Sequence, residues 1–209
     1  MTTPLPADAE TLFARLRYSL KDALGVSCNG QAQEGPDALA GVDPTMPVGE
    51  SAAGSGSEAA QAGSAEAPAF IGIHTGGAWL AARLHAELGL SSPLGFLSSA
   101  FYRDDVQARG LSMRMQPTHI DFDVNGRDIV LVDDILHTGR TIRAALNEIF
   151  DYGRPARVRL AVLIDRGERE LPVQPDHVGA RLVLQPGEKL ALSQRTNGMF
   201  ELRVESVQA

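Results

Sequence analysis

The stretch IVLVDDILHTGR, residues 129–140, decides the fold. It opens with a dense apolar run, residues 129–132, which is typical of a β-strand buried on both faces. Two carboxylates, Asp133 and Asp134, follow without a spacer, and a turn of small and polar residues comes next. Adjacent carboxylates repel one another unless cations or hydroxyl donors satisfy them. We therefore predict that a ligand binds at the end of this strand.

The turn after the carboxylates leads into a predicted helix, residues 141–152. Backbone N–H groups at a helix N-terminus lack partners within the helix, and the positive end of the helix dipole attracts anions. The residues at this point are Thr138, Gly139, Arg140 and Thr141. The carboxylates can accept hydrogen bonds from hydroxyl groups, and the adjacent turn can bind a phosphate. Together they indicate a site for a sugar phosphate. The alternative is a strand-end Asp that only caps the helix, with Thr141 an ordinary first-turn residue.

The remaining segments alternate between strand and helix patterns. Strands are predicted at residues 70–74, 94–101 and 158–164, and a helix at residues 78–88. This rhythm predicts an α/β fold with a central twisted parallel sheet flanked by helices.

Two further elements are predicted at the ends of the chain. An amphipathic helix spans residues 8–24. Near the C-terminus, residues 189–194 and 199–204 flank Asn197-Gly198, which is a hairpin signal. We therefore expect a small antiparallel addition to the parallel sheet.

Residues 29–69 differ from the rest in composition. They are rich in Ala, Gly, Ser, Pro and Glu, and they contain no aromatic residue, Lys or Arg. Without them the chain has 20 acidic and 19 basic residues, so most of its net charge of −7 comes from this segment. Such a composition cannot bury enough surface to offset the entropy lost on ordering. We predict a disordered insertion, either a solvated linker or an interaction tail.

The composition also bounds the compartment. Cys28 is the single cysteine, so no internal disulfide can form. No apolar run approaches the roughly 18 residues needed to span a bilayer. The N-terminus lacks the basic start and apolar core of a secretory signal. We expect a cytoplasmic protein that has no membrane partner.

The segment VLVDDILHTGRTIRAAL, residues 130–146, resembles the ribose-phosphate motif of type I phosphoribosyltransferases. Three other segments, GIHTGG, AFYRDD and GRPARVRLAVLIDRGERELPVQPDHVG, are similar to the PyrR family. Members of that family are pyrimidine operon attenuation regulators that also have uracil phosphoribosyltransferase activity. The resemblance covers about residues 70–180 and leaves out the insertion.

The resemblance implies a reaction and a role for the opening motif. A nucleobase nitrogen displaces pyrophosphate from 5-phosphoribosyl 1-pyrophosphate, and Mg²⁺ holds the leaving group. Asp133 and Asp134 would be catalytic and take the ribose hydroxyls, with Mg²⁺ bound mainly through the substrate nearby. The turn Thr138, Gly139, Arg140 and Thr141 would hold the 5-phosphate.

The pyrophosphate site is implied by two other turns. Thr75, Gly76 and Gly77 match the pyrophosphate loop, although such a turn can also be a plain strand-to-helix connection. Asp165 and Arg166 end a predicted strand and would lie near the base and pyrophosphate. The alternative for this pair is a surface ion pair.

One position departs from the family pattern. The best-known members carry an Arg where this chain has Gly76, so a charge-assisted contact to pyrophosphate is missing. Arg103, within the matching block YRDD, is the candidate to replace it as a catalytic and pyrophosphate-binding residue. Arg109 and Arg114, in the following loop, are further candidates.

Base recognition is implied at Val178 and Gly179, in a hood of about residues 166–209. The hood departs from the pattern of close relatives, which leaves the base open. The domain organisation is then an N-terminal helix (1–28), the insertion (29–69) and a phosphoribosyltransferase domain (70–209).

Two functions remain. The first is a uracil phosphoribosyltransferase that makes UMP and regulates pyrimidine biosynthesis genes. The alternative is a catalytically weak regulator that senses UMP or phosphoribosyl pyrophosphate and acts through RNA or protein partners. A pyrimidine operon leader RNA would require a basic face, which the near-neutral core does not indicate. We expect a homo-oligomer by resemblance.

Overall fold

The computed structural model describes residues 3–26, 67–98 and 116–206. Residues 1–26 and 66–209 belong to one compact unit. The predicted insertion lies almost wholly outside the described residues, as does the block YRDD with its neighbouring arginines.

A five-stranded parallel sheet forms the centre of this unit. Its strands, all parallel to their neighbours and ordered β2-β1-β3-β4-β5, are β1 (Ala69–Ile73), β2 (Leu94–Leu97), β3 (Asp128–Leu136), β4 (Arg157–Asp165) and β5 (His177–Arg181). The predicted parallel sheet is confirmed. β1 pairs with β2 on one side and with β3 on the other, so the direction of winding reverses between β1 and β3. Ligands of open α/β sheets bind at such a switch point, beyond the carboxyl ends of the strands.

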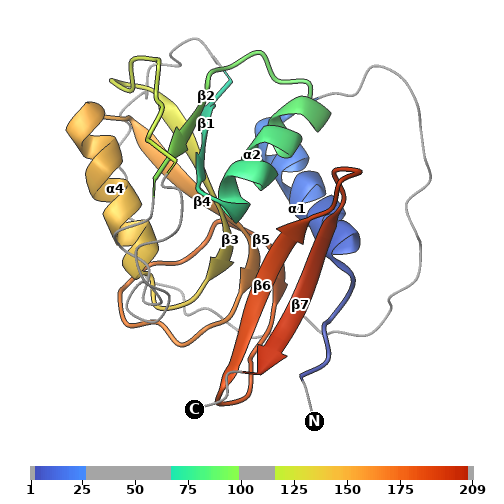
Figure 1. Cartoon of the computed structure of the whole chain (residues 1–209). Coiled ribbons are helices and arrows are strands. Elements are labelled where there is room, and N and C mark those ends of the chain that lie inside the picture. Colours follow the sequence, from blue (N-terminus) through green and yellow to red (C-terminus); the bar gives the residue numbers. More distant parts are fainter. Residues whose placement is uncertain (1–2, 27–66, 99–115, 207–209) are drawn as a thin grey trace, which may run out of the picture. The chain divides into compact units, whose positions relative to one another are not determined.

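Helices cover both faces of the sheet (Figure 1). α1 (Ala9–Leu24) and α2 (Gly76–Glu87) pack on the face that carries Val130 and Val132 of β3. α4 (Arg140–Tyr152) packs on the opposite face. In the described ranges, no helix combines the length and apolar character that crossing a bilayer requires.

The C-terminal residues form the predicted hairpin. β6 (Glu188–Gln194) and β7 (Phe200–Ser206) are antiparallel, and Gly198 in the turn has a φ of 82° that favours glycine. The hairpin is attached to α1, because the rings of Phe13 and Phe200 lie 5.4 Å apart between centroids.

Several element boundaries differ from the sequence prediction, and the differences at β3 and α2 affect the site. β3 continues four residues beyond Val132, because its ladder with β4 runs on until Leu136 pairs with Asp165. The two carboxylates are therefore part of the strand and do not follow it. α2 begins at Gly76, so the glycines predicted as a turn form the first turn of the helix.

Candidate active site

The site lies at the carboxyl edge of the sheet, where β1 and β3 lead into α2 and α4 (Figure 1). The parallel pairing of β1 with β3 brings these two connections to the same edge. Segments more than 50 residues apart in the chain, Thr75–Gly77 and Asp133–Asp134, thus meet at the switch point.

Both carboxylates of the opening motif are buried, Asp133 to 3% and Asp134 to 9% relative exposure. The Asp133 Oδ1 atom accepts from the Asp134 backbone N–H at 2.9 Å, and Asp134 Oδ1 accepts from the Ile135 N–H at 3.1 Å. Burying an ionised carboxylate is costly unless donors surround it. A ligand that brings hydroxyl groups or a cation to this edge would supply further favourable contacts.

Gly76 and Gly77 let α2 approach the carboxylates closely. A Cβ atom at Gly76 would lie 2.2 Å from Asp134 Oδ2, and one at Gly77 would lie 2.4 Å from the Val132 carbonyl oxygen. Real Cβ contacts are never this short, so only glycine fits with the present placement of Asp134. The structure therefore brings the predicted pyrophosphate loop against the predicted ribose site.

The N-termini of α2 and α4 differ from that of α1. At α1, the Asp8 side chain caps the helix by accepting from the backbone N–H groups of Glu10 and Thr11. In the described structure, the N-cap residues of α2 and α4, Thr75 and Gly139, contribute no side-chain hydrogen bond. Both N-termini flank the carboxylates and present backbone N–H groups and the positive dipole end, which suits phosphate groups.

The turn before α4 combines a left-handed glycine with a threonine hydroxyl. Gly139 has a φ of 92°, which favours glycine, and the Arg140 N–H donates to the Thr138 hydroxyl at 3.3 Å. Thr138 is buried, and Thr141 is the second residue of α4. The Arg140 guanidinium pairs with Glu170 at 2.5 Å. The charged group of Arg140 is therefore engaged by a carboxylate in this structure.

Asp165 and Arg166 end β4 at the same edge of the sheet. The Asp165 carboxylate accepts from the Gly167 N–H at 2.9 Å and pairs with Arg169 at 2.5 Å. The Arg166 side chain is only 15% exposed, and its Nε makes no hydrogen bond within the described residues. Its Nη2 lies 3.9 Å from Glu168 Oε2. A mostly buried guanidinium whose Nε has no partner among the described residues is suited to an anionic ligand.

Arg169 is a site-edge residue that the sequence analysis missed. Its guanidinium contacts Asp165 and the backbone of the turn before α4. The available signal was the charged run after β4, DRGERE, in which the basic residues stand next to acidic ones.

The predicted base-binding residues are not brought to the edge. Val178 and Gly179 lie inside β5, where Val178 pairs with Val162 and a Cβ atom at Gly179 would lie 2.6 Å from the Leu163 carbonyl oxygen. Arg103, Arg109 and Arg114 lie outside the described residues.

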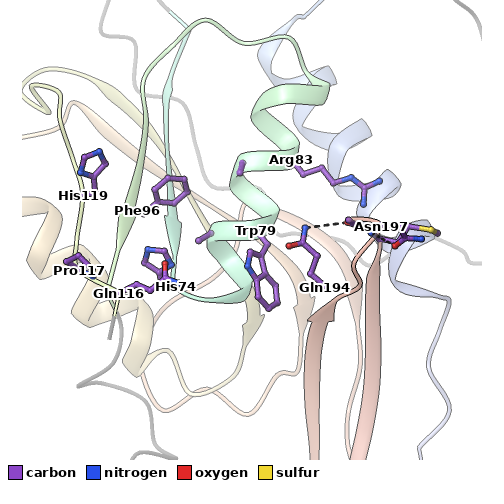
Figure 2. A pocket seen from close by; sticks show the side chains of 13 residues that line it. His74, Trp79, Arg83, Phe96, Gln116, Pro117, His119, Gln194 and Asn197 are labelled. Carbon is purple, nitrogen blue, oxygen red and sulfur yellow. Dashed lines mark hydrogen bonds between the residues drawn. The ribbon is translucent and has the colours of Figure 1, made fainter. Parts of the chain in front are cut away.

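A separate cavity of about 880 Å³ lies beside α2 and the residue that follows β1, His74 (Figure 2). Its walls include the aromatic side chains of His74, Trp79 and Phe96, together with Gln194 and Asn197 from the hairpin. Burial lowers the pKa of His74, which favours the neutral ring. The carboxylate pair and the turn before α4 do not line this cavity.

The residues present fit a magnesium ion that the substrate shares. Within the described ranges, no three His, Cys, Asp or Glu side chains form a metal cluster. Mg²⁺ usually binds through one or two carboxylates plus substrate phosphates and waters, which matches a site with only Asp133 and Asp134.

Comparisons with known proteins show the family of the chain. The family model of the phosphoribosyl transferase domain matches residues 54–182. The "Bifunctional protein PyrR" of Nitrosococcus oceani is 56% identical over 128 residues, which are 60% of this chain and 72% of that protein. Its counterpart in Pseudomonas aeruginosa is 54% identical over 127 residues, which are 61% of this chain and 75% of that protein.

Solved structures show the same fold at low sequence identity. The hypoxanthine phosphoribosyltransferase of Trypanosoma cruzi has a TM-score of 0.54 and 15% identity, covering 98% of this chain and 97% of that one. A hypoxanthine-guanine phosphoribosyltransferase from Bacillus anthracis has a TM-score of 0.53 and 15% identity, covering 91% and 85%. The predicted type I phosphoribosyltransferase fold and enzyme class are confirmed, and the chain belongs to the PyrR family.

Proposed function

We propose that this edge of the sheet transfers the 5-phosphoribosyl group from phosphoribosyl pyrophosphate to uracil, giving UMP and pyrophosphate. PyrR proteins combine this activity with regulation of pyrimidine genes, and the chain belongs to that family. The observation that carries the proposal is a pair of buried carboxylates between two helix N-termini whose N-cap residues, Thr75 and Gly139, make no side-chain cap hydrogen bond. This arrangement matches a ribose with a phosphate on either side.

The 5-phosphate is assigned to the turn Thr138, Gly139, Arg140 and Thr141. The support is the left-handed Gly139, which lets the backbone approach an anion, and the dipole of α4. Backbone N–H groups and the threonine hydroxyls would make the contacts. The Arg140 guanidinium would first have to leave Glu170 to join them.

The ribose hydroxyls are assigned to Asp133 and Asp134. The departing pyrophosphate makes C1 of the ribose resemble an oxocarbenium ion, so catalysis consists of positioning and stabilisation of charge. Two ionised carboxylates beneath the ring orient it through its hydroxyls and favour the developing positive charge. A bound Mg²⁺, held by these carboxylates and the substrate, would neutralise charge on the leaving group.

Pyrophosphate is assigned to Thr75, Gly76, Gly77 and Arg166. The α2 N-terminus offers N–H groups, and Arg166 offers a buried donor without a partner among the described residues. Arg103 stays the candidate for the charge that Gly76 lacks. The Asp165 carboxylate is bound by Arg169 and by the Gly167 N–H, so we assign it an indirect role at this site.

The base is assigned to backbone groups after β4. The sequence-based candidates, Val178 and Gly179, lie inside β5 and would have to act from there. The family supports uracil as the base. We also propose a cytoplasmic location, because the phosphorylated substrates are metabolites of that compartment, and a homo-oligomer by resemblance to the family.

The regulatory partner is either a pyrimidine operon leader RNA or a protein. An electrophoretic shift of leader RNA in the presence of UMP separates them, since RNA binding requires a shift at low salt. The second candidate function, a UMP or phosphoribosyl pyrophosphate sensor with weak turnover, is favoured by one observation. Gly76 removes a cation from the pyrophosphate loop.

Calorimetric binding of phosphoribosyl pyrophosphate tests the site assignment. We expect Asp133→Asn with Asp134→Asn to abolish binding, because the amides accept weakly from ribose hydroxyls and hold no cation. The free energy of unfolding should change by only about 1–2 kcal/mol, since asparagine has the same shape. Unchanged affinity in this folded double variant would contradict the assignment.

A further inference from the structure

We propose that Arg169 is a positioning residue that aims the backbone N–H groups of the phosphate loop, residues 137–140, at the 5-phosphate. The inference rests on the proposed function for the identity of the ligand. Arg169 belongs to the segment between β4 and β5, residues 166–176, and it contacts the backbone of this loop at His137.

Arg169 uses all three guanidinium nitrogens. Nη1 donates to the His137 carbonyl at 2.7 Å and to the Gly167 carbonyl at 2.9 Å, while Nε donates to the Val173 carbonyl at 3.0 Å. Nη2 pairs with Asp165 at 2.5 Å. With a side-chain exposure of 19%, the guanidinium lies mostly out of water, where such charge-assisted bonds are strong.

The following residues hold the next carbonyl of the phosphate loop. The N–H groups of Glu170 and Leu171 both donate to the Thr138 carbonyl oxygen, at 3.0 and 3.2 Å. Two successive carbonyls of the loop, those of His137 and Thr138, are therefore bound by one segment. Gly139 faces that segment too, since a Cβ atom there would lie 3.4 Å from Leu171 Cβ.

Peptide geometry turns these contacts into a direction for the N–H groups. The carbonyl of one residue and the N–H of the next share a plane and point in opposite directions in a trans peptide. The one cis peptide bond in the described structure is His74–Thr75, so the bonds within the phosphate loop are trans. When the carbonyls of His137 and Thr138 point at the Arg169 segment, the N–H groups of Thr138 and Gly139 point away from it. Two aligned N–H groups form a small anion-binding nest.

The anchor at the other end of Arg169 is rigid. Asp165 is the last residue of β4 and pairs in register with Leu136 of β3. Its carboxylate is also fixed by the Gly167 N–H. Arginine suits this place because its planar fork reaches several acceptors at once, whereas a lysine ammonium is a single point on a flexible stem.

The test compares Arg169→Gln and Arg169→Lys with the control Arg181→Gln. Arg181→Gln removes the same charge as Arg169→Gln near the same carboxylate, because Arg181 Nε lies 3.9 Å from Asp165 Oδ2. The Arg181 side chain, however, is 81% exposed. The first measurement is calorimetric affinity for UMP together with the KM values for phosphoribosyl pyrophosphate and uracil. The second is hydrogen exchange of the Glu170 and Leu171 amides, which reports whether the loop stays attached.

We expect Arg169→Gln to weaken UMP binding and raise the KM for phosphoribosyl pyrophosphate by about tenfold or more. The KM for uracil, which has no phosphate, should stay within about twofold, and the amides of Glu170 and Leu171 should exchange faster. Arg169→Lys should fall between Arg169→Gln and the wild type, because it keeps the charge but not the fork. Arg181→Gln should match the wild type.

Two results would overturn the inference. One is an Arg169→Gln protein with wild-type UMP affinity and amide exchange. The other is an equal rise in the KM for uracil and for phosphoribosyl pyrophosphate, which would mean general damage to the fold. If the wild-type protein bound no UMP, the proposed function would fail instead, and amide exchange alone would decide whether Arg169 holds the loop.

Discussion

At the scale of single residues, the site depends on glycine as much as on carboxylates. Gly76 and Gly77 remove the side chains that would keep α2 away from β3, so the predicted pyrophosphate and ribose sites touch. The same Gly76 lacks the cation found in the best-known family members. Glycine at position 76 thus both allows α2 to approach Asp134 and leaves the predicted pyrophosphate loop without a cation.

Gly76→Ala should therefore weaken binding of phosphoribosyl pyrophosphate by about tenfold or more. The new methyl group would lie 2.2 Å from Asp134 Oδ2, so the carboxylate must turn away from its present position. Calorimetric titration measures the loss.

Gly89→Ala is the control for strain in a glycine variant. Gly89 has a φ of 63° with no atom near its missing Cβ, so alanine there costs about 1–2 kcal/mol of stability and should leave affinity unchanged. Equal affinity of Gly76→Ala and the wild type would show that Asp134 does not act from its present position.

At the scale of elements, one ion pair joins α1, α2 and the hairpin. Glu10 of α1 accepts from Arg83 of α2 at 2.7 and 2.8 Å and from the Phe200 N–H of β7 at 2.6 Å. The Arg83 guanidinium also lies over the rings of Phe13 and Phe200, at 4.3 and 5.0 Å from their centroids. This contact ties α1 and β7 to α2, the helix whose N-terminus is the predicted pyrophosphate loop.

Glu10→Gln should lower the free energy of unfolding at pH 7 by about 1 kcal/mol, because the pair is partly exposed. The hydrogen bond from Arg83 lowers the pKa of Glu10 below its ordinary value of 4.5. The stability that Glu10 supplies is thus present above pH 4.5 and is lost as the pH falls toward the lowered folded pKa.

Urea unfolding between pH 3 and pH 7 measures this difference between the variant and the wild type. Stability of the variant should fall less steeply with acid. Asp151→Asn, at an exposed carboxyl of α4, is the matched control and should follow the wild-type curve. A variant with the wild-type slope would mean that Glu10 does not contribute to acid sensitivity.

At the scale of the whole molecule, the described elements belong to one compact unit that leaves out residues 27–65. Ala69 is the first residue of β1 and Pro68 is buried, so an excision must end before them. Replacing residues 30–65 with a short Gly-Ser linker should preserve melting temperature and UMP affinity. An insoluble or unfolded product would show that the fold depends on this segment.

The parallel sheet and the position of two carboxylates next to a buried strand could be predicted from the sequence, because apolar runs and turn residues are local signals. The extent of β3 could not be predicted, since the strand continues through Asp133 and Asp134 only by pairing with β4. The Arg169 contacts were equally out of reach, because they join residues about 30 positions apart through backbone carbonyls. Composition and periodicity carry no information about such contacts.

The most direct test of the central claim is the rate of UMP formation from uracil and phosphoribosyl pyrophosphate with Mg²⁺. The wild-type protein should form UMP, and the folded variant with Asp133→Asn and Asp134→Asn should form none. Hypoxanthine and cytosine in place of uracil serve as controls for the base. A wild-type protein that binds phosphoribosyl pyrophosphate or UMP but forms no UMP would contradict the enzyme and leave a nucleotide sensor.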